Sequence, residues 1–169
     1  DRDKSFLDHE RSMGDYEANK FYANKVSFLE KYFNNRYKVY NIFLQKNLSK
    51  ENKVLSLGSG RCISELFLLD CGHNIICSDI EVPNCYEKSK EIFGDFKYEK
   101  FNILNHPYDK KFNSIICFSM LYLFEKKELS IFFKNTWNTL ENEGFLIVDP
   151  GGAENNFLTF FFDTIYLPI

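Results

Sequence analysis

The stretch VLSLGSGRC, residues 54–62, joins a short apolar run to two glycines that are spaced by one residue. Helical apolar spacing follows directly, at Ile63, Leu66 and Phe67, and Gly72 ends it. A strand that enters a glycine turn and then a helix lets the backbone pass close to a ligand at the carboxyl edge of a sheet. An ordinary tight turn has the same pattern, so a ligand site needs support from a second feature.

Asp79 is that second feature. It lies 21 residues after Gly58, at the end of another apolar run that begins at Ile75. A carboxylate at the end of the second strand can accept hydrogen bonds from both hydroxyls of a ribose. It can also cap the turn that follows. Together with the glycine turn upstream, its position favours the first role and predicts a nucleotide site.

Short apolar runs and helical patterns alternate through residues 54–167. Continuous runs of Ile, Val and Leu are best explained by parallel strands that are buried on both faces. The sequence therefore predicts an α/β fold with a Rossmann-like, doubly wound, mainly parallel sheet. We expect strands at 54–57, 75–79, 96–101, 114–118 and 145–148, and helices from residue 63 to Gly72, at 84–93, along the stripe Leu129, Phe133, Trp137 and Leu140, and at 157–167.

Residues 1–50 are predicted to form a helical N-terminal extension that precedes a domain of residues 51–169. Apolar residues at helical spacing carry this prediction, first at Tyr22, Val26, Leu29 and Phe33, and then at Val39, Ile42 and Phe43. Some aromatic side chains of the extension lie where a lid over a ligand would be, although core packing explains most of them better: Tyr16, Phe21 and Tyr22.

Composition narrows the class of protein. The 169 residues are 44% hydrophobic and carry 21 basic and 24 acidic side chains, a formal charge of −3. A disordered chain is excluded, and a nucleic-acid partner is not expected because a basic stripe is missing. No apolar stretch reaches the roughly 20 residues of a membrane span. The five cysteines form no CxxC pair and the three histidines have no ligand spacing, which predicts reduced thiols, a cytoplasmic location and no metal.

The order of these features resembles that of the class I S-adenosylmethionine-dependent methyltransferases, over residues 54–150. VLSLGSGRC is similar to the first motif of the family, IICSDI to the second and FNIL to the end of the third strand; FNSIICFSMLYLF and GFLIVDPGG are similar to the fourth and fifth strands. The resemblance implies S-adenosyl-L-methionine as the cofactor. The residues that it assigns to cofactor binding are Gly58, Ser59, Gly60, Asp79, Ile80, Asn102, Ile103 and Phe118.

Within this resemblance, the two glycines would admit the methionine part of the cofactor, Asp79 would hold the ribose, and Asn102 with Ile103 would border the adenine. Three positions depart from the family's pattern. Ser56 stands where an acidic residue is usual, Cys62 where the last glycine is usual, and Asn102 where Asp is common. The side-chain oxygen of Asn102 can still accept a hydrogen bond from the adenine amino group, and Cys62 is small enough for the turn.

The family's fold has seven strands, whereas the sequence predicts five. The sixth and seventh strands are therefore expected to be missing, as in a chain that is truncated at its C-terminus. A complete chain that ended there would leave an exposed sheet edge.

The resemblance implies methyl transfer to a small-molecule acceptor, for which the cofactor carries the methyl group and the protein provides alignment. No catalytic residue is assigned; His106 and Asp149 are the candidate general bases by position. The oligomeric state stays open. One alternative is a degenerate methyltransferase-like domain that serves binding or assembly. Another, disfavoured because Ile63 stands at the third glycine position of a dinucleotide loop, is an NAD(P)-binding oxidoreductase.

Overall fold

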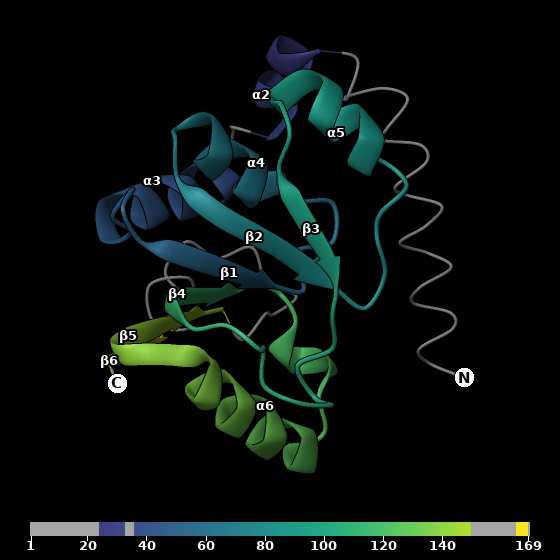
Figure 1. Ribbon diagram of the computed structural model, residues 1–169. Coiled ribbons are helices and arrows are strands. Elements are labelled where there is room, and N and C mark those ends of the chain that lie inside the picture. Colours follow the sequence, from purple (N-terminus) through teal and green to yellow (C-terminus); the bar gives the residue numbers. More distant parts are fainter. Residues whose placement is uncertain (1–23, 33–35, 150–164, 169) are drawn as a thin grey trace.

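A six-stranded sheet forms the centre of the computed structural model, which describes residues 24–32, 36–149 and 165–168. The strand order is β3-β2-β1-β4-β5-β6, and the first five strands run parallel to one another (Figure 1). This confirms the predicted α/β fold and its five parallel strands. The strands are β1 Lys53–Leu57, β2 Asn74–Asp79, β3 Lys97–Lys100, β4 Phe112–Cys117, β5 Leu140–Val148 and β6 Ile165–Pro168.

The strand β6 was not expected from the sequence. It pairs antiparallel with β5, from Phe145 opposite Pro168 to Val148 opposite Ile165. The helix predicted over residues 157–167 is therefore wrong for its last residues, while residues 157–164 lie outside the described part of the chain. Short apolar runs are compatible with either element, because hydrophobic spacing distinguishes them poorly over so few residues. The described residues thus contain one strand more than the sequence predicts.

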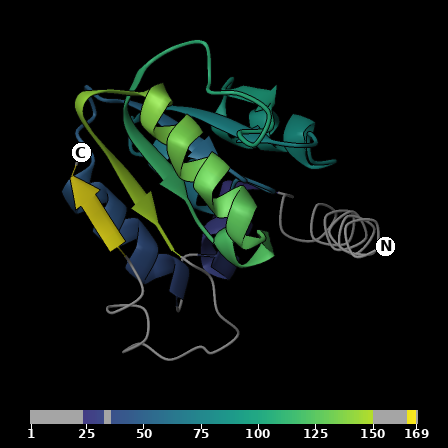
Figure 2. The ribbon, with the colours of Figure 1, turned by 90° about the horizontal axis from the view of Figure 1, so that it is seen from below.

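Helices cover both faces of the sheet. Figures 1 and 2 show α6 on one face and α3 and α4 on the other, as in a doubly wound fold. The helices are α2 Lys25–Tyr32, α3 Arg36–Asn47, α4 Ile63–Asp70, α5 Tyr86–Phe93 and α6 Lys126–Thr139, with a short 3-10 helix, η1, at Leu121–Leu123.

The two faces of the sheet have separate apolar cores. On the face of α6, Leu55 and Ile115 pack with Phe132, and all three side chains are fully buried. On the opposite face, Val54 packs with Leu44 of α3. Consecutive residues of a strand point to opposite faces, so burial on both explains the continuous apolar runs of the sequence. Helix α3 belongs to the second core through Leu44, and α2 packs through Phe28 in a further cluster with Leu66 of α4. The division into an extension of residues 1–50 and a domain of residues 51–169 stays a prediction.

The buried face of α6 differs from the predicted one. Phe133 and Trp137 of the predicted stripe are 39% and 59% exposed. Asn135 is buried instead, and its side-chain Nδ2 donates to the carbonyl of Ile103 at 2.7 Å. The hydroxyl of Thr139 accepts the N–H of Tyr108 at 2.9 Å. The buried face of α6 is therefore mostly polar, and its Asn135 and Thr139 hold the segment that follows β3.

The N-terminal helices also turn a different face to the core than predicted. In α2, Phe28 and Tyr32 are buried, whereas Val26 is 65% exposed. In α3, Leu44 is fully buried and Ile42 is 54% exposed. Hydrophobic spacing therefore located both helices but not the side on which they pack.

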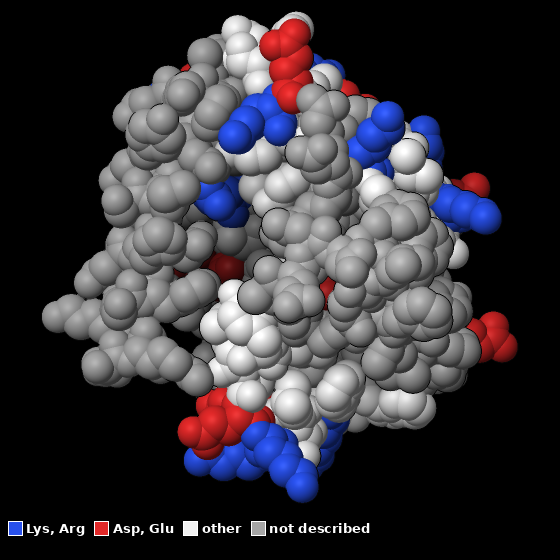
Figure 3. All heavy atoms as spheres, turned by 180° about the vertical axis from the view of Figure 1, so that it is seen from behind, with Lys and Arg blue, Asp and Glu red and all other residues white. Residues whose placement is uncertain are grey.

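Several general properties of the chain can be read from the described residues. All five cysteines are free thiols. No helix in the described ranges is long and apolar enough to cross a membrane. On the face shown in Figure 3, the described basic and acidic side chains lie in small groups. The predicted cytoplasmic location and the predicted absence of a nucleic-acid partner stay predictions.

Candidate functional site

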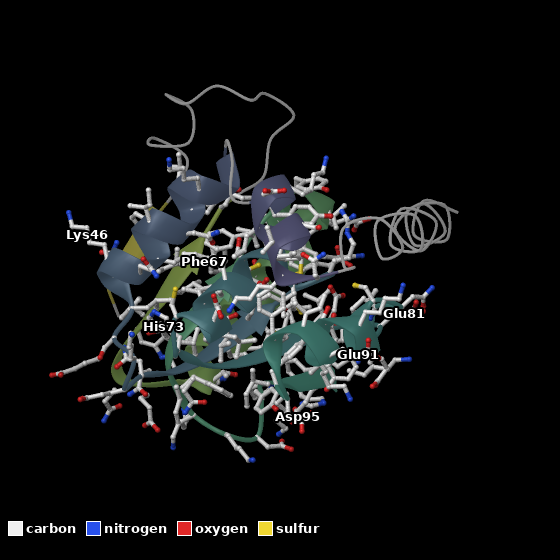
Figure 4. All side chains as sticks on the ribbon, turned by 90° about the horizontal axis from the view of Figure 1, so that it is seen from above. Lys46, Phe67, His73, Glu81, Glu91 and Asp95 are labelled. Carbon is white, nitrogen blue, oxygen red and sulfur yellow. The ribbon has the colours of Figure 1, made fainter. Side chains whose placement is uncertain are left out.

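A cleft of about 670 Å³ lies at the carboxyl edge of the parallel sheet. Its walls come from the segments that follow β1, β2, β3 and β4. Figure 4 shows Glu81, a cleft residue that follows β2, at the opposite end of the molecule from His73, which precedes β2. The carboxyl edge is where open α/β sheets bind their ligands.

The structure brings the predicted cofactor-binding residues together. Although they come from four different segments of the sequence, all of them line this one cleft: Gly58, Ser59, Gly60, Asp79, Ile80, Asn102, Ile103 and Phe118. Their contacts with a cofactor stay predictions.

The backbone of the glycine turn after β1 favours glycine at both positions. Gly58 and Gly60 have φ angles of +67° and +48°, which a residue with a Cβ atom adopts only with strain. A Cβ on Gly58 would lie 2.5 Å from Sδ of Met120, in the segment after β4. A Cβ on Gly60 would meet no atom within 4 Å, so the backbone at Gly60 borders open space in the cleft.

Serine side chains attach the glycine turn to β2. The N–H of Ser59 donates to the carbonyl of Ser78 at 2.9 Å, and the N–H of Ser78 donates to the hydroxyl of Ser59 at 3.1 Å. The hydroxyl of Ser78 donates to the carbonyl of Ser56 at 2.7 Å. These bonds hold the floor of the cleft in place with the chain's own groups.

Asp79 is oriented by the backbone around it. Its Oδ2 accepts the N–H of Gly60 at 2.9 Å, and its Oδ1 accepts the N–H of Ile80 at 2.7 Å. A carboxylate has about four acceptor positions, so each oxygen can take a further hydrogen bond. The side chain is half-buried at the cleft, where those positions can meet hydroxyl groups of a ligand.

Glu65 is a cleft residue that the sequence did not reveal. It lies in the first turn of α4, is 5% exposed, and its Oε1 accepts the hydroxyl of Ser56 at 2.6 Å. Burial raises the pKa of Glu65 to about 7, although the hydrogen bond from Ser56 acts in the opposite direction. A single acidic residue within the apolar sequence ISELFLLD, one turn after the glycines, is the signal that could have identified it.

The segment after β3 forms one end of the cleft. The side-chain oxygen of Asn102 accepts the N–H of Leu104 at 2.9 Å, which fixes the turn. This oxygen has a second acceptor position and can still take a bond from an adenine amino group. Ile103 is 4% exposed, and α6 holds its carbonyl through Asn135.

Helix α3 contributes two tyrosines to the cleft, Tyr37 and Tyr40, which belong to none of the sequence motifs. The hydroxyl of Tyr40 donates to Oδ2 of Asp149, at the end of β5. The rings of Tyr40 and Phe118 are 4.9 Å apart. Part of the predicted N-terminal extension therefore forms a wall of the cleft. The aromatic residues suggested for a lid, Tyr16, Phe21 and Tyr22, lie outside the described residues.

Neither candidate general base is among the described residues that line the cleft. His106 is exposed, and its Nδ1 lies 2.8 Å from the carbonyl oxygen of Pro107. Asp149 is buried behind Tyr40. Within the described ranges, no group of three or more His, Cys, Asp or Glu side chains could hold a metal ion.

Comparison with known proteins identifies the fold. No protein-family model and no curated protein matches the chain. Among solved structures, a TehB-like SAM-dependent methyltransferase from Corynebacterium glutamicum matches with a TM-score of 0.65 and 15% identity, over 90% of this chain and 80% of that one. A second match is the 1,6-didemethyltoxoflavin-N1-methyltransferase of Burkholderia thailandensis, which was solved with bound 1,6-didemethyltoxoflavin and S-adenosylhomocysteine. It has a TM-score of 0.59 and 15% identity, over 66% of this chain and 50% of that one.

A third match is the glycopeptide N-methyltransferase MtfA, solved with sinefungin. It has a TM-score of 0.58 and 12% identity, over 69% of this chain and 54% of that one. The chain thus spans about half the length of the latter two proteins. These matches show that the chain has the fold of solved S-adenosylmethionine-dependent methyltransferases.

Proposed function

We propose that this chain is an S-adenosylmethionine-dependent methyltransferase that acts on a small molecule. One observation carries the proposal. The residues that sequence motifs assign to the cofactor line a single cleft, at the carboxyl edge of a sheet with the fold of such enzymes. Neither the fold nor the motifs alone would lead to this function, because similar sheets support many chemistries.

The cleft fits the parts of the cofactor. Asp79 presents carboxylate oxygens for the ribose hydroxyls, and Gly60 gives close access to the backbone. Asn102 and Ile103 would border the adenine. The cofactor supplies a methyl group on a positively charged sulfur, and the aromatic ring of Tyr40 at the cleft suits a cation. The chain's own residues would align the acceptor and exclude water from the cleft.

The proposed acceptor is a small molecule, because the cleft also has to hold the cofactor within its volume of about 670 Å³. The Burkholderia methyltransferase has a bound 1,6-didemethyltoxoflavin, so this fold accommodates a compound of that kind beside the product of the cofactor. We do not propose a nucleic acid or a membrane as a partner. We propose a cytoplasmic location, which is in keeping with the free thiols of the five cysteines.

Asp79→Ala is expected to weaken the binding of S-adenosylhomocysteine about 30-fold, because two hydrogen bonds from the ribose to a charged acceptor would be lost. Isothermal titration calorimetry with S-adenosylmethionine and S-adenosylhomocysteine measures this change. Asp95→Ala is the matched control, because Asp95 is an exposed aspartate after α5 and outside the cleft (Figure 4). The Asp95→Ala variant is expected to bind S-adenosylhomocysteine with the affinity of the unchanged chain.

Two results would contradict the proposal. If the unchanged chain bound neither compound, a degenerate domain that serves assembly would be the better account. If it bound NAD instead, the oxidoreductase alternative would be favoured. Binding that is sensitive to Asp79→Ala would establish the cofactor site, and methyl transfer to an acceptor would then establish the enzyme.

A further inference from the structure

Glu65 places a carboxyl group at the floor of the cleft, in a position where water cannot solvate it well. It is 5% exposed; the hydroxyl of Ser56 donates to its Oε1 at 2.6 Å, and its own backbone N–H also hydrogen-bonds to the carboxyl. No ion pair joins Glu65 to a lysine or arginine within the described ranges. An ionised carboxylate is costly in such a place unless a positive charge accompanies it.

Among the described residues, the titratable groups that face Glu65 from neighbouring elements supply no such charge. They are Cys62 before α4, Asp79 and Cys77 of β2, Tyr98 of β3 and Cys117 of β4. Burial raises the pKa of each of these thiols and of the phenol, so they are neutral near pH 7, whereas Asp79 is an acid. The charged side chains that the structure describes in the cleft are one base, Arg61, which forms no ion pair with Glu65, and four acids, Glu65, Asp79, Glu81 and Glu128.

We propose that the carboxylate of Glu65, held by Ser56, binds a protonated amino group of the ligand, so that the cleft selects a nucleoside that carries an amino acid over one that does not. This inference rests on the proposed function and adds a second charged contact to the one at Asp79. An ammonium group has three donors and no acceptor, which matches a carboxylate that has one oxygen already bonded. Ser56 is a positioning residue, because it acts through Glu65.

Binding at this site releases a proton. Without a ligand, Glu65 is partly protonated near neutral pH, because its pKa is about 7. The ammonium group favours the ionised form, so the O–H bond of the carboxylic acid breaks and the proton passes to the buffer. The affinity for an amino-group ligand is therefore expected to rise with pH, whereas the affinity for a ligand without that group changes little.

The test compares two ligands by calorimetry. S-adenosylhomocysteine carries the amino acid, and 5′-methylthioadenosine keeps the nucleoside and sulfur but lacks it. Between about pH 6 and about pH 7.5, the affinity for S-adenosylhomocysteine is expected to rise about eightfold, following the ionised fraction of Glu65. Titrations in buffers of different ionisation enthalpy are expected to show release of about half a proton near pH 7. For 5′-methylthioadenosine we expect neither effect.

Glu65→Gln keeps an oxygen for Ser56 and removes the charge. It is expected to weaken S-adenosylhomocysteine binding about tenfold at about pH 7.5, to abolish its pH dependence, and to leave 5′-methylthioadenosine binding unchanged. The matched control is Glu91→Gln, since Glu91 is exposed on α5 and outside the cleft (Figure 4). The role of Glu65 would be overturned if the unchanged chain bound S-adenosylhomocysteine with the same affinity at all pH values, or if Glu65→Gln weakened the binding of both ligands equally. Either result would leave the proposed function standing. Failure of the unchanged chain to bind either ligand would overturn the proposed function as well.

Discussion

Gly58→Ala is expected to destabilise the chain by about 3 kcal/mol, as measured by urea unfolding. Two causes add. The φ angle of +67° strains any residue with a Cβ, at about 1 kcal/mol, and the new methyl group would lie 2.5 Å from Sδ of Met120. Met120 would have to leave its place in the segment after β4, or the glycine turn would have to move. Either shift disturbs two walls of the cleft, so the affinity for S-adenosylhomocysteine is expected to fall with the stability.

Gly60→Ala is the matched control for this substitution. Gly60 has a φ of +48°, but a Cβ there would meet nothing within 4 Å, so only the backbone strain of about 1 kcal/mol is expected. In Gly58→Ala, the further change Met120→Ala is expected to restore part of the lost stability by removing the clashing sulfur. Equal losses for the two glycine variants would show that Met120 does not constrain the turn.

The unfolding free energy of the ligand-free chain is expected to contain a contribution from Glu65 that falls as the pH rises. The pKa of Glu65 is about 7 in the folded chain and about 4.5 when the residue is exposed, so the folded state binds more protons between these values. Stability is therefore lost across this window and levels off above about pH 7. The shift corresponds to about 3 kcal/mol.

Glu65→Gln isolates this contribution. Above about pH 7 the variant is expected to be more stable than the unchanged chain by about 3 kcal/mol, and the difference is expected to vanish below about pH 4.5. The pKa of His73 is lowered by burial, so His73 makes the unfolding free energy rise with pH. This contribution is the same in both chains, and it cancels when the unfolding free energy of one is subtracted from that of the other. Glu91→Gln is expected to leave the curve unchanged. A constant difference between the Glu65→Gln and unchanged chains at all pH values would contradict the prediction.

Local patterns predicted most of what determines the position of the cleft. The glycine turn at residues 58–60 and the acid at Asp79 lie at strand ends, and the ends of parallel strands meet at one edge. Their neighbours in space could therefore be predicted once the strands were recognised. Ser56 stands where the methyltransferases that the motif resembles usually have an acid, yet the structure brings a carboxyl group to its hydroxyl from α4. The position of this carboxyl group, which belongs to Glu65, depends on how α4 packs against the sheet. A local sequence motif carries no information about that packing.

The remaining site residues depend on contacts between distant parts of the chain. Tyr40 and Asp149, which share a hydrogen bond, are 109 positions apart. The buried face of α6 was mispredicted for the same reason. Asn135 is buried because it bonds to Ile103, 32 positions earlier, and Trp137 stays 59% exposed. Hydrophobic spacing locates helices well, but it misplaces a buried face on which Phe132 is accompanied by three polar residues.

The distribution of the cysteines has a consequence for how opening of the folded chain can be observed. Cys62, Cys77, Cys85 and Cys117 lie at the start of α4, in β2, before α5 and in β4, and none is more than 1% exposed. A thiol reagent can reach each of them only while its own part of the structure is transiently unfolded. The labelling rates of these four thiols therefore report local unfolding at four places in the fold. Their decrease on addition of a nucleoside would show which places the ligand stabilises.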